Sequence, residues 1–385
     1  MYNILTLNKI SAAGLGKFDK EKYFCTDDCA SPDAVIVRSA SMHDTEIPSS
    51  VLSIARAGAG YNNIPVDKCT EKGICVFNTP GANANAVKEL VLCALFLSSR
   101  KIVAGAKWCE TLKGSGDEVS KKVEKGKSNF AGPEIKGKTL GVIGLGAIGV
   151  LVANGAKALG MDVIGYDPFL SDKAASTLDK TIRVTSVIDR VFEESDYITL
   201  HEPLNDSTRN TICAETLAKC KDGVRILNFA RGEIVNNSDI LSALEGGKCS
   251  AYATDFPTDD QLCADGVIAL PHLGASTPES EENCAVMAVE QTAEYIENGN
   301  VINSVNLPCV SKDRPADKSR ITVITDSDVS EKIFDLLDSK GVDRTDASVS
   351  IRKNTGYVII DTDSDVSGIS DELKAVGGVI KVRVL

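Results

Sequence analysis

The feature that most constrains this chain is a glycine-rich turn between a short apolar segment and an alanine-rich one. Residues 139–143 are apolar and partly β-branched, which predicts a buried strand. Glycines at positions 144, 146 and 149 follow as G-x-G-x-x-G. In a strand-to-helix turn, such glycines permit the tight turn, the approach of a pyrophosphate and close helix packing. The residues that this pattern places beside the phosphates are Gly144, Gly146, Ala147 and Ile148.

A second predicted strand, residues 162–166, ends in Asp167, which lies 23 residues after Gly144. A carboxylate at this position accepts hydrogen bonds from the adenosine ribose hydroxyls and repels a 2′-phosphate. By itself, G-x-G-x-x-G also occurs in ordinary glycine-rich turns. The strand, helix, second strand and terminal Asp167 in register favour a dinucleotide site, and we expect NAD rather than NADP.

Composition narrows the class of protein. A chain of 385 residues, 43% of them apolar and 25% charged, is long enough for two or three domains with a substantial core. The net charge of −12 argues against a nucleic-acid or acidic-membrane partner, because either would need a basic surface. The longest apolar run, residues 90–97, is too short to cross a bilayer.

The cysteine pattern indicates free thiols. The 12 cysteines are scattered and form no C-x-x-C pair, so we expect no structural zinc and no other metal site. Residues 1–10 have neither a basic start nor a long apolar core, which predicts that no signal peptide is present. A reducing cytoplasm is the expected location.

The order of apolar segments predicts an α/β protein with two doubly wound parallel sheets and a small third domain. Short apolar runs repeatedly end in a polar residue, as expected when one sheet edge carries a site. The charged stretch 311–320 contains Pro315 and marks a linker, and a βαββαβ pattern follows it. The predicted domains are a split substrate-binding domain, a Rossmann domain inserted into it and a C-terminal domain, at residues 1–98 with 280–310, 99–279 and 318–385.

Two residues stand where hydride-transfer chemistry needs them. Such a reaction requires a general base for the hydroxyl proton and a cation for the substrate carboxylate. His272 follows an apolar run, and Arg231 ends another one in the same half of the chain. Asp259 and Asp260 lie between them, and a carboxylate beside the imidazole would raise its pKa. The alternative interpretation is a structural histidine and a surface arginine.

Several of these motifs together resemble the D-2-hydroxyacid dehydrogenase family, over nearly the whole chain. The matching segments are residues 144–167, 201–204 with Thr208, 228–232 and 271–277. The resemblance implies that Arg231 binds the carboxylate and His272 is the acid/base. It also implies that Asp255 lies near the nicotinamide carboxamide. The other cofactor-binding residues that it implies are His201, Pro203, Thr208 and Ala230.

Within the family, the resemblance is strongest to the members that oxidise 3-phospho-D-glycerate at the start of L-serine biosynthesis. It implies a small phosphorylated 2-hydroxy acid as the substrate. A substrate with both a phosphate and a carboxylate needs more than one cation, and two further arginines meet that need. The substrate-binding residues implied are Arg38, Ser39, Arg56, Gly58 and Asn83. Whether Arg56 contacts the substrate of its own subunit stays open.

Two departures from the family pattern bear on these expectations. The family's histidine partner is usually a Glu, and here the segment reads Thr-Asp-Phe-Pro-Thr-Asp-Asp. Counting from the strand ends favours Asp260, whereas matching Phe-Pro-Thr favours Asp259. The C-terminal unit resembles an ACT domain, a regulatory or oligomerisation module. However, residues 325–329 lack the Asn and Pro-Gly of serine-inhibited relatives, which leaves serine binding open.

The resemblance therefore implies NAD-dependent oxidation of 3-phospho-D-glycerate by a homodimer or homotetramer. One alternative is a hydroxypyruvate or glyoxylate reductase of the same family, which would not need the extra arginines. The other is an NAD(H)-sensing binding protein without turnover, against which Arg231 and His272 both count.

Overall fold

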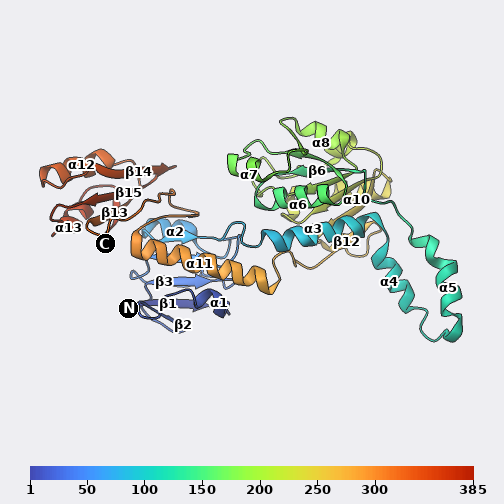
Figure 1. The fold of residues 1–385 in the computed structure, drawn as a ribbon, viewed down its shortest axis with the longest axis horizontal. Helices are drawn as coiled ribbons and strands as arrows, with labels where there is room; N and C mark the ends of the chain where they lie inside the picture. Colours follow the sequence, from blue (N-terminus) through green and yellow to red (C-terminus); the bar gives the residue numbers. More distant parts are fainter. The chain divides into compact units, whose positions relative to one another are not determined.

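The computed structural model describes residues 1–385, and the chain divides into two compact units (Figure 1). The first unit combines Met1–Asn83 with Pro278–Leu385, and the second unit is Ala84–Thr277. The insertion of one unit into the other follows the predicted order of domains. The two units are described separately below.

The first unit contains a five-stranded parallel sheet with the order β2-β1-β3-β4-β5. Every residue of its central strand β3 is buried, as the uninterrupted apolar run predicts. The strands are β1 (Tyr2–Leu7), β2 (Tyr23–Thr26), β3 (Ala34–Val37), β4 (Ser53–Arg56) and β5 (Cys75–Phe77), and the helices are α1 (Ala12–Leu15), α2 (Val66–Glu71) and α11 (Pro278–Asn298). The order of strands reverses between β1 and β3, which makes their carboxyl ends the expected ligand position.

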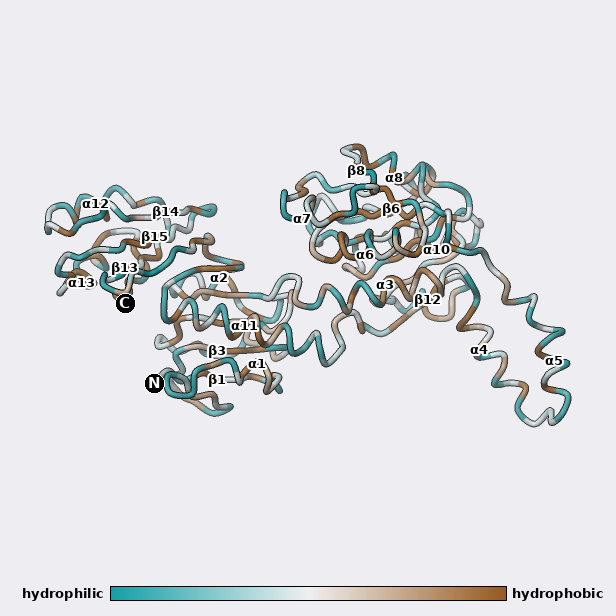
Figure 2. The backbone as a smooth tube through the Cα atoms, in the orientation of Figure 1, coloured by the Kyte–Doolittle hydropathy of each residue, from teal (hydrophilic) through white to brown (hydrophobic).

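The second unit contains a seven-stranded parallel sheet with the order β12-β11-β10-β9-β6-β7-β8. Its central strands are hydrophobic, with β6 drawn brown in Figure 2. The strands are β6 (Thr139–Ile143), β7 (Asp162–Tyr166), β8 (Arg183–Thr185), β9 (Tyr197–Leu200), β10 (Val224–Asn228), β11 (Cys249–Thr254) and β12 (Val267–Ala269). The helices that accompany the sheet are α3 (Ala84–Ser99), α6 (Ala147–Ala158), α7 (Asp172–Thr177), α8 (Ile188–Glu194), α9 (Ala214–Lys219) and α10 (Asn237–Glu245), with 3-10 turns η3 (Gly232–Ile234) and η4 (Asp259–Gln261). The switch point lies between β6 and β9.

The boundary between the units differs from the one expected at residue 98. The whole of α3 belongs to the second unit, because its apolar side chains, including Val91 and Leu95, share a core with Leu140 and Val152. Its Ser98 carbonyl also accepts a hydrogen bond from Nε of Arg225 at 3.0 Å. The first unit therefore ends at Asn83 and resumes at Pro278.

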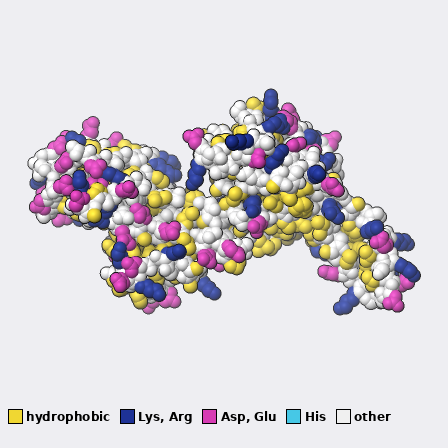
Figure 3. Space-filling view, viewed as in Figure 1, with side chains coloured by type: hydrophobic (Ala, Val, Ile, Leu, Met, Phe, Trp, Pro, Cys, Tyr) yellow, Lys and Arg dark blue, Asp and Glu magenta, His cyan; other side chains and the backbone are white.

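Between α3 and β6 the chain forms a hairpin of two helices. Its elements are α4 (Ile102–Glu110), η1 (Gly116–Glu118), α5 (Val119–Gly126) and η2 (Lys127–Phe130). None of these elements contains a buried residue. Trp108 and Phe130 pack on each other with ring centroids 5.2 Å apart, while Ile102 and Val103 are exposed. Hydrophobic side chains consequently appear among charged ones on the surface of the hairpin (Figure 3).

The C-terminal domain confirms the predicted βαββαβ order and fits an ACT-like fold. Its antiparallel sheet has the order β14-β15-β13-β16. The elements are β13 (Ser319–Thr325), α12 (Ser330–Ser339), β14 (Asp346–Arg352), β15 (Thr355–Thr362), α13 (Ile369–Lys374) and β16 (Val379–Val384). One face of the sheet packs on α12 and α13 through Val323 and Ile360. The other face, with Tyr357 and Ile359, joins the core of the first unit.

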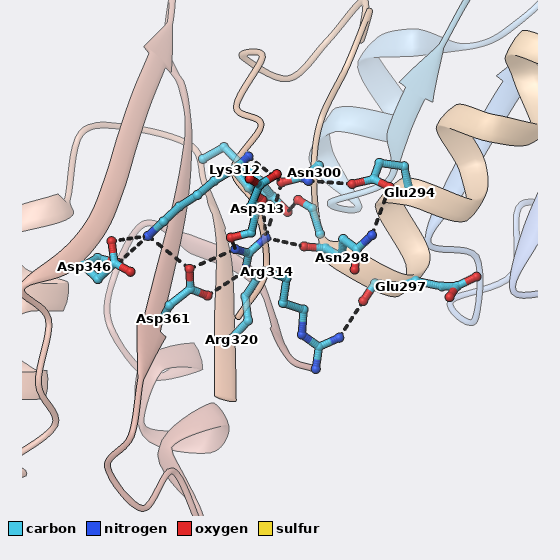
Figure 4. Close-up of polar contacts among 12 residues, drawn as sticks. Glu294, Glu297, Asn298, Asn300, Lys312, Asp313, Arg314, Arg320, Asp346 and Asp361 are labelled. Carbon is cyan, nitrogen blue, oxygen red and sulfur yellow. Dashed lines mark hydrogen bonds and ion pairs between the residues drawn. The ribbon is translucent and has the colours of Figure 1, made fainter. Parts of the chain in front are cut away.

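Side chains from the C-terminal segment hold the end of α11 (Figure 4). Five successive backbone carbonyls, at residues 295–299, accept hydrogen bonds from Arg383 (two, at 3.0 and 2.6 Å), Arg314 (2.7 Å), Arg320 (2.8 Å) and Tyr357 (2.6 Å), in chain order. The last carbonyls of a helix have no partner within the helix and carry a partial negative charge. Three arginines therefore satisfy four of these carbonyls and complement the helix dipole at the same time, and the hydroxyl of Tyr357 satisfies the fifth.

We call these contacts between the C-terminal segment and the end of α11 the junction. The guanidinium of Arg320 lies at its centre. It is fully buried and forms a two-pronged ion pair with Asp361, with Nε–Oδ1 at 2.6 Å and Nη2–Oδ2 at 2.8 Å. Lys312 adds a second cation 3.0 Å from Oδ2 of Asp361 and also contacts Asp346. Burial would raise the pKa of Asp361, but the hydrogen bonds from Arg320 and Lys312 outweigh it and hold the pKa below its ordinary value.

No helix is long and apolar enough to span a membrane.

Candidate functional site

The glycine-rich turn lies at the switch point of the second sheet. Gly144 has φ +92°, and a Cβ there would lie 2.7 Å from the carbonyl oxygen of His201, which follows β9. At Gly149 a Cβ would lie 1.9 Å from the carbonyl oxygen of Gly144, so only glycine fits between helix and turn. By contrast, a Cβ on Gly146 would meet no atom within 4 Å. The open side of Gly146, at the start of α6, is the predicted position of the pyrophosphate.

The carboxylate of Asp167 lies next to this turn. Its Oδ2 accepts a hydrogen bond from the backbone N–H of Leu145 at 2.8 Å, and its Oδ1 accepts one from Phe169 at 2.8 Å. These bonds fix the carboxylate, and each oxygen retains acceptor capacity for a ribose hydroxyl. Burial, with the charge of Asp167, raises the pKa of Glu202. The predicted position of the adenosine ribose therefore has two acidic residues beside it, and only Asp167 was named in the sequence analysis.

His201 and the loop after it occupy the opposite side of the switch point. Nε2 of His201 lies 3.0 Å from Oγ1 of Thr199, and desolvation lowers the pKa of the imidazole to about 3. The ring therefore stays neutral at physiological pH. Oγ1 of Thr208 donates to the carbonyl of Pro203 at 2.6 Å and holds the loop closed.

Two of the three predicted catalytic residues, Arg231 and His272, act electrostatically on Asp255, at the end of β11. Asp255 is 3% exposed, its Oδ1 has no hydrogen-bond partner, and burial raises its pKa. The charges of His272 and Arg231 act in the opposite direction, as does a hydrogen bond from the backbone N–H of Gly274. The imidazole of His272 packs on Phe256 with ring centroids 4.5 Å apart.

His272 and Arg231 are both exposed. Asp255, whose carboxylate is affected by both of their charges, is buried. Arg231 follows β10 and donates from Nη1 to the carbonyl of Ala230 at 2.6 Å. Ala230 is held in turn, since its N–H donates to Oδ1 of the buried Asn228 at 3.2 Å. A cation, an imidazole and a carboxylate thus lie together at the carboxyl edge of the sheet.

The predicted histidine partner Asp260 lies in η4, on the exposed loop between β11 and β12. Its Oδ2 is 3.4 Å from Nδ2 of Asn237, at the start of α10. Asp259, the alternative, begins the same turn and is also exposed. The assignment of Asp260 to His272 stays a prediction, and Asp255 is an additional carboxylate near the imidazole.

In the first unit, Arg38 and Ser39 follow β3 at the switch point of the smaller sheet. Oδ1 of Asn8, just after β1, accepts hydrogen bonds from the N–H groups of Ser39 and Ala40 at 3.0 and 2.6 Å. Asn8 takes this position with φ +71°, a conformation that Asn tolerates better than most residues. The segment that carries Arg38 is thereby tied to the neighbouring strand end.

Arg56 lies in β4 beside Arg38, because Val37 and Arg56 are paired in the sheet. Its Nε donates to the carbonyl of Arg38 at 2.8 Å, and its Nη1 donates to the carbonyl of Gly60. Arg56 therefore shapes the turn around Gly58 as well as supplying a positive charge. Asn83, the last predicted substrate residue, has a buried Oδ1 without a hydrogen-bond partner.

Three residues beside the predicted site residues were missed by the sequence analysis: Asn8 and Glu281 in the first unit, and Glu202 in the second. Glu281, in the first turn of α11, forms an ion pair with Arg38 at 2.6 Å. Glu202 lies inside a motif used in the sequence analysis, so this acidic side chain could have been identified from the sequence. Asn8 and Glu281 meet their partners across 31 and 243 residues, and no local pattern indicates such contacts.

A Rossmann sheet with a carboxylate beside its glycine-rich turn, and with a cation, an imidazole and a buried carboxylate at its edge, is typical of the doubly wound NAD-dependent dehydrogenases. Comparison with known proteins identifies the family. Residues 95–274 match the family model "D-isomer specific 2-hydroxyacid dehydrogenase, NAD binding domain". The chain belongs to the D-isomer specific 2-hydroxyacid dehydrogenase family, and its Rossmann half is the family's NAD-binding domain.

Individual relatives carry two different substrate names. The chain is 41% identical to the hydroxypyruvate reductase of Thermotoga maritima over 271 residues, which cover 67% of this chain and 83% of the relative. It is 33% identical to the D-3-phosphoglycerate dehydrogenase of Bacillus subtilis over 331 residues, 81% of this chain and 60% of the relative. The NAD⁺-bound 3-phosphoglycerate dehydrogenase of Entamoeba histolytica has a similar structure, with a TM-score of 0.59, 27% identity and coverage of 79% of this chain and 98% of that one.

The chain spans only 60% of the length of the Bacillus subtilis relative and about half of other phosphoglycerate dehydrogenase relatives.

Proposed function

We propose that this protein oxidises 3-phospho-D-glycerate to 3-phosphohydroxypyruvate with NAD, the first step of L-serine biosynthesis. The observation that carries the proposal is the pair of arginines at neighbouring strand ends, Arg38 and Arg56, in addition to Arg231 of the second unit. A substrate with a carboxylate alone needs one cation, whereas a phosphorylated one needs more. The names of the Bacillus subtilis and Entamoeba histolytica relatives support the same substrate.

In the proposed reaction, each residue near Asp255 has a separate task. Arg231 binds the substrate carboxylate, and His272 accepts the proton of the C2 hydroxyl. Bound NAD supplies the acceptor for the hydride that leaves C2. Asp255 holds the loop of His272 through the N–H of Gly274, and its negative charge favours the imidazolium that proton transfer creates. Asp260 is the predicted second support for that imidazolium.

The test is the initial rate of NADH oxidation with 3-phosphohydroxypyruvate, hydroxypyruvate and glyoxylate, each with and without L-serine. We expect kcat/KM for the phosphorylated acid to exceed the other two by about 10- to 100-fold, the effect of one or more additional charge-assisted contacts. A decrease in rate with L-serine would assign an effector role to the C-terminal domain.

A reductase of unphosphorylated hydroxypyruvate is the second candidate. The Thermotoga maritima relative supports it, as does the ion pair of Arg38 with Glu281, which reduces the positive charge available to a phosphate. Equal or higher kcat/KM with hydroxypyruvate would select this function. Binding of NADH without turnover of any of the three acids would instead identify an NAD(H)-sensing protein.

A further inference from the structure

A carboxylate of this chain already contacts the arginine that the proposed function assigns to the substrate phosphate. Oε1 of Glu281 lies 2.6 Å from Nη2 of Arg38, and the two side chains are 41% and 39% exposed. The backbone of Arg38 is fixed independently, because its carbonyl accepts Nε of Arg56 at 2.8 Å. The ion pair therefore joins a rigid strand end to the first turn of α11 through side chains that solvent reaches.

Such a pair is easily broken. An exposed ion pair with a single contact contributes little to stability, since water and salt screen it. A phosphate group offers an arginine shorter, stronger and often two-pronged hydrogen bonds. The ionised Glu281 also repels any dianion that approaches Arg38. It opposes phosphate binding in two ways, as a competitor for the guanidinium and as a like charge.

We propose that Glu281 is an internal competitor for the phosphate position at Arg38, so that substrate binding exchanges its carboxylate for the phosphate group. This inference rests on the proposed function for the identity of the anion. Glu281 does not touch the reacting atoms, and its effect is on affinity and selectivity between phosphorylated and unphosphorylated acids. It lowers the affinity of the site for free inorganic phosphate as well.

The variant that tests the proposal is Glu281→Gln, which keeps the size and hydrogen-bonding capacity of the side chain and removes its charge. Glu282→Gln is the matched control, because Glu282 is the exposed neighbour in the same helix turn. Two quantities are measured at low ionic strength: the KM for 3-phosphohydroxypyruvate and the inhibition constant of inorganic phosphate against hydroxypyruvate reduction. A third variant, Arg38→Met combined with Glu281→Gln, tests whether any gain passes through Arg38.

We expect Glu281→Gln to lower both constants by about 3- to 10-fold, the effect of one nearby surface charge on a dianion. The KM for hydroxypyruvate should be unchanged, Glu282→Gln should match the wild type, and the Arg38→Met combination should lose the gain. Higher salt should reduce the difference between Glu281→Gln and the wild type.

Unchanged or higher constants in Glu281→Gln would overturn the proposal, as would a gain that persists without Arg38. A failure of the proposed function is distinguishable from this result. If the wild type does not reduce 3-phosphohydroxypyruvate, the phosphate inhibition constant still compares Glu281→Gln with the wild type. Tighter phosphate inhibition in the variant would then support the competitor role, and no phosphate inhibition of either protein would exclude it.

Discussion

His272 is exposed and its ring packs on Phe256, so its removal tests chemistry rather than stability. We expect His272→Ala to lower kcat/KM by about 10²- to 10⁴-fold, the usual contribution of a general acid/base. The melting temperature and the Kd for NADH should stay at wild-type values. Unchanged kcat/KM would remove His272 from the mechanism.

The carboxylate of Asp255 should lower the stability of the protein and support its activity. Its raised pKa in the folded protein means that stability is lost as the pH rises through that pKa, because the buried carboxylate must then ionise. Asp255→Asn removes this cost, so we expect the melting temperature to rise by about 1–3 °C at pH 8 and by less at pH 4. The kcat of the same variant should fall. A melting temperature that drops equally at both pH values would contradict the account.

The predicted site residues that the structure places at the edge of one sheet are those fixed by a strand end and its neighbouring turn. Asp167, Arg231, Asp255 and His272 all follow strands of the second sheet, where local pattern and topology coincide. The ion pair of Glu281 with Arg38 could not be predicted from a strand end and its turn. It depends on how α11 packs on the small sheet, and packing between segments 243 residues apart leaves no local signature.

At the scale of elements, the glycine-rich turn gives a matched pair of variants. Gly149→Ala would place a methyl group 1.9 Å from the carbonyl oxygen of Gly144, so we expect a clear loss of thermal stability. Gly146→Ala meets no atom within 4 Å, so the protein without cofactor should keep its melting temperature. The added methyl group stands where the pyrophosphate approaches, and the Kd for NADH should rise at least about tenfold. Equal Kd values for Gly146→Ala and the wild type would contradict this placement.

The junction at the end of α11 gives a second test at this scale. Arg320→Met leaves Asp361 buried without its main partner, and we expect a loss of about 3–5 kcal/mol in the free energy of unfolding by urea. Arg344→Met is the control, because Arg344 makes the same two-pronged contact with Asp338 at 2.8 Å on the surface. Its effect should be much smaller. Similar losses for both variants would show that burial does not determine the strength of the junction.

Elements with a strong periodic pattern of apolar residues were predicted from the sequence better than short polar elements were. The central strands and the βαββαβ order were predicted, whereas β8 was not, because its three residues form a polar edge strand with little burial. The segment between α3 and β6 contains α4 and α5. Gly114 and Gly116 adopt positive φ between them and form the turn that separates the two helices.

At the scale of the whole molecule, the C-terminal domain is less independent than its linker suggested. One face of its sheet contributes Tyr357 and Ile359 to the core that also contains Phe77 and Tyr295. Its arginines hold the last turn of α11, whose first turn carries Glu281. The βαββαβ order of this segment was predicted correctly, but the segment forms one compact unit with residues 1–83. The shared core depends on a fit between two surfaces, which hydrophobic periodicity within each segment does not reveal.

The measurement that tests the central claim most directly is the ratio of kcat/KM for 3-phosphohydroxypyruvate to that for hydroxypyruvate, in the wild type and in Arg38→Met. We predict a ratio of about 10 to 100 in the wild type, because the proposed function assigns Arg38 to the phosphate group, which hydroxypyruvate lacks. In Arg38→Met the ratio should fall toward one while the rate with hydroxypyruvate is preserved. A wild-type ratio near one, or a high ratio that Arg38→Met leaves unchanged, would contradict the account.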